Sequence, residues 1–363
     1  MTIQSGFVTA LYLFDVAEAI DVGAVKTQLG AQASVARLDD KSPGPPRLHY
    51  IQPPVIADGQ ALGCLEIDGF RVRVKFYDYG VISLMLTRPF DGAWSDLLDL
   101  SQSLIENESL EQRALDACER VVKEVASALN DARASFLSED YFVFTIAPTD
   151  AAGSADQVVA ANGVEIAQIV RGERQPLSRQ ERDEVLKHRW SYLEDDLVVA
   201  AWNAAFIYDT EAGALALIEI FEFANSQLLE FRYHDELLEG ETTTLYARLE
   251  ERHWLDMLRG RRHTNEALRI QSLYLDVNEL TDRMENAVKF VGDPFAARLF
   301  GLAAARLGLE RWKKNVEDKL DTLNDIHRFA VEQTGISQAN VLELVIVAIL
   351  LLELGLFFAG IMK

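Results

Sequence analysis

The histidines and cysteines of this 363-residue sequence do not stand at spacings that bind a metal or activate a nucleophile. None of the six histidines has a second histidine four residues away with a glutamate between them, and neither cysteine stands at metal-ligand spacing. The Gly-x-Ser-x-Gly, P-loop and Gly-x-Gly-x-x-Gly patterns are also absent. We therefore predict no metal, no cofactor and no catalytic residue. The alternative is an enzyme whose site lacks a linear motif.

A cationic cluster stands out because the rest of the sequence is acidic. Arg259, Arg261 and Arg262 lie in one predicted turn, whereas the chain carries 57 acidic against 35 basic residues and a net charge of -22. The plain interpretation is a solvated turn whose bases follow a helix end. The functional interpretation is a contact for a partner or for lipid head groups, of which anionic lipid is the better candidate.

Two carboxylates interrupt the most apolar stretch of the sequence. Val341–Met362 is a run of 22 residues, about 33 Å long as a helix, and it contains Glu343 near its start and Glu353 near its middle. A hydrocarbon core is about 30 Å thick, so the run is long enough to cross it. Glu353 is a tolerated neutral side chain, a polar contact between membrane helices of an oligomer, or a proton or ion site.

The free energy of insertion favours a membrane helix despite these carboxylates. The run holds 15 Leu, Ile, Val or Phe residues, which together favour insertion by about 4 to 9 kcal/mol. A central acidic residue costs about 2.5 to 3.5 kcal/mol, and Glu343 can reach the interface. We therefore expect a transmembrane helix over residues 337–362.

The two ends of the sequence suggest a topology. Lys363 follows the apolar run, and the N-terminus has no basic segment typical of a presequence. We therefore expect a single-pass, tail-anchored protein of the cell inner (plasma) membrane, with its N-terminal bulk in the cytoplasm. Two cysteines fit a reducing compartment. The net charge of -22 makes direct nucleic-acid binding an unfavoured function.

Residues 1–209 are predicted to form an α+β head. Strand-like runs cover 7–14, 70–76 and 81–86, the last two flanking a turn at Tyr77–Gly80 that indicates a hairpin. A helix is predicted for 94–130, and a second strand-like series begins at residue 141. The order of elements suggests two related strand-helix-hairpin-helix halves.

Residues 210–335 are predicted to form an α-helical coiled-coil hairpin, which we call the neck. Apolar residues recur every three or four positions from Leu217 to Leu249 and again from Ile270 to Val291, as in helices that pack along a seam. Pro294 begins a third helix that we predict to run to about residue 333, about 60 Å.

Four stretches of the chain resemble one known family. They are a hairpin, a long-helix motif, a second-helix motif and the start of the apolar run: Phe76–Val81, Phe223–Tyr233, Asp276–Val277 with Arg283–Ala287, and Leu342–Ile346, the last followed by Glu353. Together they resemble the "required for meiotic nuclear division" (YagE-like) family. The resemblance implies a membrane-anchored domain of unknown function, with eukaryotic members that tether mitochondrial translation. Without a presequence, a bacterial or cytosolic-side member is expected.

These observations favour a non-enzymatic, membrane-tethered scaffold. It would self-associate through its neck and membrane helix, lie on the lipid bilayer and recruit a protein partner to the inner face of the membrane. The alternatives are an enzyme with a motif-less site in the head and an accessory subunit of a membrane transporter.

Overall fold

The computed structural model describes most of the chain, and the description below is limited to that part. The described residues are 2–35, 52–63, 66–105, 107–148, 154–250, 261–288, 294–326, 328, 346–347 and 349–351. The chain divides into two compact units, residues 1–233 with 282–312 and residues 234–281 with 313–363. The division into domains at 1–209, 210–335 and 337–362 stays a prediction.

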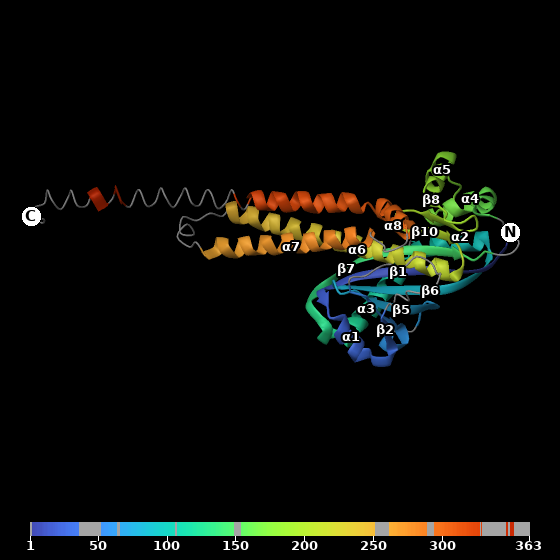
Figure 1. Ribbon diagram of the computed structural model, residues 1–363, viewed down its shortest axis with the longest axis horizontal. Helices are drawn as coiled ribbons and strands as arrows, with labels where there is room; N and C mark the ends of the chain where they lie inside the picture. The colour runs from blue at the N-terminus through green and yellow to red at the C-terminus, as the bar shows by residue number, and fades with distance from the viewer. Residues whose placement is uncertain are drawn as a thin grey trace, which may run out of the picture. The chain divides into compact units, whose positions relative to one another are not determined.

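The first unit is a mixed α+β structure, as the sequence predicts. Its described residues form a ten-stranded sheet in the order β2-β3-β5-β6-β1-β7-β10-β9-β8, with β4 paired to β5 (Figure 1). The strands run antiparallel except for the parallel pair β7–β10. Their bounds are β1 Thr2–Ile20, β2 Ala33–Val35, β3 Val55–Asp58, β4 Glu66–Ile67, β5 Phe70–Phe76, β6 Val81–Ala93, β7 Leu129–Ile146, β8 Arg189–Trp190, β9 Leu197–Ala200 and β10 Ala204–Tyr208.

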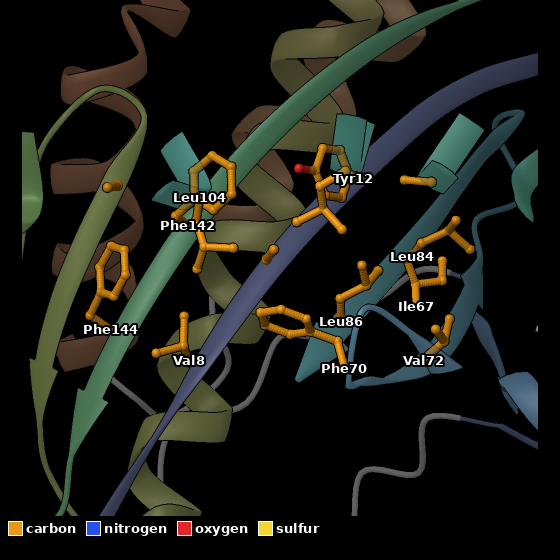
Figure 2. Close-up of a cluster of buried hydrophobic side chains, with 14 of the residues drawn as sticks. Val8, Tyr12, Ile67, Phe70, Val72, Leu84, Leu86, Leu104, Phe142 and Phe144 are labelled. Carbon is orange, nitrogen blue, oxygen red and sulfur yellow. The ribbon is translucent and has the colours of Figure 1, made fainter. Parts of the chain in front are cut away.

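Strand β1 shows how the sheet divides its side chains between two faces. Successive side chains of a strand point to opposite faces, and Tyr12 and Phe14 lie in the apolar core whereas Thr9 and Asp15 belong to the other face. Figure 2 shows Val8 and Tyr12 in this core beside labelled side chains of the neighbouring strands. The sheet therefore has one apolar face and one face that carries polar groups.

Five helices accompany the apolar face. The apolar core cluster takes in side chains of all five, and the strongest helix–sheet packing is made by α2, α3 and α4. Polar caps set several helix starts: Asp21 accepts from the amide of Ala24 in α1, and Asn107 accepts from Leu110 in α3. The helices are α1 Val22–Leu29, α2 Trp94–Ile105, α3 Glu108–Glu124, α4 Ala155–Arg171 and α5 Arg179–Lys187.

The first half of helix α6 (Glu211–Glu250) covers the other face of the sheet, where the polar residues Thr9 and Asp15 of β1 alternate with Leu11 and Leu13. The Phe221 ring stacks on Tyr141 of β7, with 5.2 Å between ring centroids. On another side of the helix, Phe223 contacts Phe300 of α8 (Pro294–Leu307) at 5.9 Å. Residues 211–247 are long and apolar enough for a membrane span, yet 78% of their apolar window is buried, so α6 is a core helix of this fold.

The sequence prediction holds for the type of most elements and misses some boundaries. The β5–β6 hairpin around residues 77–80 is confirmed. Where the sequence predicts one helix over 94–130, the structure has two, α2 and α3, and the second ends at Glu124. Strand β7 begins at Leu129 rather than near residue 141. Asn107 caps α3 and thereby separates it from α2.

The second unit consists of helical segments in the described residues. They are the end of α6, most of α7 (Arg261–Val288), and helical residues 313–326, 328, 346–347 and 349–351. Their buried apolar side chains are Leu238, Leu245, Ile270, Leu273, Val277, Leu280, Val316, Leu320 and Leu323. Lys319 also pairs with Asp235 at 3.0 Å and with Glu239 at 2.8 Å.

The prediction of one uninterrupted helix from Pro294 to about residue 333 is wrong. Helix α8 ends at Leu307, and Gly308 adopts a left-handed backbone with φ of +68° before helical residues resume at 309. A glycine takes this conformation without the steric cost that a Cβ atom adds, so the break is encoded at this position. The apolar run from Val341 lies outside the described residues except for 346–347 and 349–351, which are helical.

Candidate functional site

Polar and charged side chains are concentrated between α6 and the sheet, where a soluble core normally holds apolar ones. We call this set the α6 polar layer. Its members are Asp15, Lys75, Tyr79, Arg133, Glu139, Glu222, Ser226, Arg232 and Tyr233. Burying charges is costly unless each is paired, so the contacts within this layer determine what it can do.

The ion pair of Lys75 and Glu222 joins β5 to α6. Lys75 is 5% exposed and Glu222 is fully buried, and a second carboxylate oxygen, of Glu219, lies 3.7 Å from the Lys75 ammonium. Burial opposes the charge, but the carboxylates of Glu222 and Glu219 outweigh it and raise the pKa of Lys75. The amine therefore stays protonated near neutral pH, which excludes it as a nucleophile.

A second contact joins β1, β7 and α6. Arg133 Nε lies 2.7 Å from Asp15 Oδ2, and Arg133 Nη1 donates to the Tyr233 hydroxyl at 2.8 Å. The guanidinium also lies 3.6 Å from the Tyr233 ring centroid. Burial raises the pKa of Asp15 to about 6, although the Arg133 charge works in the opposite direction. Arg133 thus holds the buried carboxylate and the helix at one point.

A third ion pair joins α6 to β7 at Arg232, the residue next to Tyr233. Arg232 pairs with the Glu139 carboxylate and also donates to the Ser138 carbonyl at 3.2 Å. Burial raises the pKa of Glu139, and the Arg232 charge opposes that rise. Residues 232 and 233 are therefore both fixed to the sheet, through two different arginines.

The β5–β6 turn contacts the same helix through hydroxyl groups. The oxygens of Tyr79 and Ser226 lie 2.7 Å apart, and the Tyr79 ring stacks on Tyr77 with 5.1 Å between centroids. Gly80 lets the turn lie directly against β1: its φ is +91°, and a Cβ there would lie 1.9 Å from the Ala17 carbonyl oxygen. Two stretches singled out in the sequence, the turn and the long-helix motif, therefore meet in space.

The α6 polar layer is a set of buried contacts that attach the helix to the sheet. Its ions are paired, and Glu222 and Asp15 have no exposed side-chain surface. Among the described residues, no group of three or more His, Cys, Asp or Glu side chains could hold a metal ion. The arrangement is suited to fixing α6 against the sheet with a defined register and rotation.

The residues that the sequence proposes as sites fall elsewhere. Glu343, Glu353 and Arg259 lie outside the described residues. Arg261 and Arg262 lie at the start of α7, where the structure describes the backbone but not these side chains. Their functional interpretations therefore stay predictions.

The α6 polar layer was missed in the sequence, although a signal for it exists. Arg71, Arg73 and Lys75 alternate with apolar residues in β5, which predicts solvent on their face, and only the covering helix changes that for Lys75. In α6, Glu222 stands in a stretch whose apolar residues face every side of the helix. A helix that is apolar all round is buried, so its acids need partners.

Comparison with known proteins gives the chain a family. A family model described as "Uncharacterized protein MJ0711, N-terminal domain" matches residues 5–214, which reach from β1 to the start of α6. The chain belongs to this family. Uncharacterized protein MJ0711 of Methanocaldococcus jannaschii, a relative, is 23% identical over 245 residues, which cover 67% of this chain and 73% of the relative. No solved structure gives a significant match.

Membership in the MJ0711 N-terminal domain family corrects the resemblance drawn from the sequence. The "required for meiotic nuclear division" family is not the family of this chain. Three of the four stretches behind that resemblance come from helical or apolar segments beyond residue 214. Such segments repeat a few apolar and charged residues at helical spacing, so short likenesses between them carry little information about descent.

Proposed function

We propose that this member of the MJ0711 N-terminal domain family is a non-enzymatic scaffold held to a membrane by a helix over residues 337–362, which contains the apolar run 341–362. The supporting observation is the exposure of the described residues of that run. Ile346, Val347, Ile349, Leu350 and Leu351 are helical and 48 to 63% exposed. Consecutive exposed apolar residues of this size are costly in water, and insertion into lipid removes that cost.

A comparison with α6 supports the same proposal. Helix α6 is also long and apolar enough for a span, but the fold buries 78% of its apolar window and pairs Glu222 with Lys75. The described residues of the C-terminal run have no such cover. In the proposed architecture, the α+β head is built from two related halves, the neck is helical and the membrane helix follows.

Self-association is proposed to involve the membrane helix at Glu353. The apolar seam side chains of the second unit, such as Leu238, Val277 and Leu320, are already buried within one chain. Among the described residues of the neck, the exposed large apolar side chains are those of Leu215, Tyr246 and Leu275. A carboxylate at mid-bilayer gains from a partner across a helix interface, which makes Glu353 the better candidate. The folded part would then recruit a protein partner at the inner face of the plasma membrane.

The test of membrane attachment uses the full chain expressed in a bacterium, with membranes washed in alkaline carbonate. We expect wild type to stay in the membrane fraction and the double variant Leu350→Arg/Leu351→Arg to move to the soluble fraction, since two central arginines cost about 5 to 7 kcal/mol. The matched control Tyr246→Arg/Leu275→Arg changes side chains that are 52% and 63% exposed on α6 and α7. It should behave as wild type. A wild-type chain that is wholly soluble would overturn the proposal.

Self-association is tested separately with Glu353→Leu. We expect this variant to insert normally and to lose the oligomer that wild type forms in mild detergent, as measured by light scattering coupled to size exclusion. Equal oligomeric mass for the two proteins would remove Glu353 from the interface.

A further inference from the structure

The loop between β8 and β9 presents large apolar side chains to solvent. Among the described residues of the first unit, Tyr192 at 64%, Trp202 at 60% and Leu193 at 59% are the most exposed large apolar side chains. Tyr192 and Leu193 are adjacent in this loop, residues 191–196, which we call the β8–β9 loop. Tyrosine is enriched among the residues that dominate binding energy at protein interfaces.

Hydrogen bonds hold this loop in one conformation. The amides of Tyr192 and Leu193 donate to the two carboxylate oxygens of Asp196 at 2.7 and 2.8 Å. The Glu194 carbonyl accepts from the amide of Ala155 at the start of α4, at 2.8 Å. Since the backbone is fixed before any contact with a partner, binding through Tyr192 and Leu193 loses little conformational entropy.

The aromatic rings of Phe295 and Trp190 pack against the loop at Tyr192. The Tyr192 ring lies 4.9 Å from the Phe295 ring, and Phe295 lies 5.8 Å from Trp190. The Arg298 guanidinium lies 5.0 Å from the Trp190 ring centroid. Phe295 is buried, so the Tyr192 side chain packs on the fold on one side and leaves its other side exposed.

The three residues that follow the two apolar side chains in the loop are acidic. Glu194, Asp195 and Asp196 follow Leu193 directly. Their field reaches the end of β10, where burial, and then the carboxylates of Asp196 and Asp195, raise the pKa of Asp209. An anionic lipid surface or a nucleic acid would be repelled here, whereas a cationic segment would be attracted.

We propose that the β8–β9 loop binds a cationic, apolar peptide segment of a partner protein. Tyr192 and Leu193 contact its apolar side chains, while Glu194 and Asp195 pair with its lysines or arginines. The inference rests on the proposed function, because it names the kind of protein that the scaffold recruits.

The test selects peptides from a displayed random library on the immobilised full chain in mild detergent. Selection on wild type should enrich peptides that combine Lys or Arg with aromatic or aliphatic residues. The enriched peptides should bind Tyr192→Ser/Leu193→Ser at least 10-fold more weakly and Glu194→Gln/Asp195→Asn several-fold more weakly. The control Tyr246→Ser/Leu275→Ser should bind as wild type does, and thermal unfolding should show that all variants fold.

Three results would overturn this inference: no enrichment on wild type, enrichment of acidic peptides, or equal affinity of the enriched peptides for wild type and Tyr192→Ser/Leu193→Ser. Membrane fractionation of the same proteins is read independently. A soluble wild-type chain that still binds the peptides through Tyr192 would refute the tether and leave this binding surface in place.

Discussion

Lys75 of β5 and Glu222 of α6 form an ion pair across the sheet–helix interface, with the Glu222 side chain fully buried and the Lys75 side chain 5% exposed. The pair is far apart in the sequence, by 147 positions. Each of the two side chains would be a buried, unpaired charge without the other. The pair therefore favours the one placement of α6 over the sheet that brings them together. Replacing one partner and replacing both therefore have different consequences.

We expect Lys75→Met to lower the free energy of unfolding by about 3 to 5 kcal/mol, because it leaves the Glu222 carboxylate buried and unpaired. Lys75→Met/Glu222→Met should recover most of that loss, since Glu219 is 26% exposed and can turn to water. Urea unfolding measures both. The matched control is Lys123→Met, whose partner Glu119 lies 3.9 Å away on the surface. It should change stability by no more than about 1 kcal/mol, and an equal loss for Lys75 and Lys123 would contradict the argument.

The raised pKa of Asp15 predicts that acidification favours the folded state through this group. The pKa is about 6 in the fold against a usual 3.8, so the folded chain takes up the proton at a higher pH than the unfolded chain does. The free energy of unfolding then rises as pH falls from about 7 to 4, by about 3 kcal/mol for a shift of about 2 pKa units.

The difference in unfolding free energy between wild type and Asp15→Asn isolates this contribution. As pH falls from 7 to 4, wild type should gain stability relative to Asp15→Asn, because Asn does not titrate. Asp318→Asn, the same substitution at an exposed position of the second unit, is measured alongside as the matched control. A wild-type minus Asp15→Asn difference that stays constant over this range would contradict the buried-carboxylate interpretation.

Local sequence rules predict which segments of this protein form helices and strands better than they predict which strands pair with each other. The β5–β6 hairpin follows from the apolar alternation and the turn around Gly80, and the start of α1 follows from its cap at Asp21. The rules fail where a boundary depends on a distant strand. Leu129 and the residues after it extend along β1, with Leu129 opposite Ile20, and their helix-like sequence does not reveal that pairing.

The α6 polar layer could not be predicted because each of its contacts joins distant segments. Asp15 and Arg133 are 118 positions apart, and Arg133 and Tyr233 are 100 apart. Periodicity assigns each residue to a face of its own strand or helix but does not state which face another element covers. Glu222 was the available clue, since an acid in a stretch whose apolar residues face every side of the helix requires a buried partner.

Replacing Gly80 of the β5–β6 turn with any other residue is expected to lower the stability of the fold. Its φ is +91°, and a Cβ would lie 1.9 Å from the carbonyl oxygen of Ala17, a backbone atom of β1 that cannot move aside cheaply. Gly80→Ala should therefore cost more than about 2 kcal/mol in the free energy of unfolding. Gly240→Ala is the control: a Cβ at this position of α6 would meet no neighbouring side chain within 4 Å, and the variant should be more stable by about 0.5 to 1 kcal/mol. Thermal unfolding that ranked the two variants in the reverse order would refute the steric argument.

The hydroxyl contact between Tyr79 and Ser226 is expected to couple the turn to α6 energetically. The two oxygens lie 2.7 Å apart in the buried layer, and Ser226 also donates to the Phe223 carbonyl at 2.7 Å. Tyr79→Phe and Ser226→Ala should each cost about 1 kcal/mol. Because both variants remove the same contact, the double variant should cost less than the sum of the two, with a coupling of about 0.5 to 1 kcal/mol by urea unfolding.

The control for this cycle is Tyr246→Phe, at a 52% exposed position of α6, which should leave stability unchanged. Strict additivity of Tyr79→Phe and Ser226→Ala would mean that the turn and the helix are neighbours without mutual stabilisation.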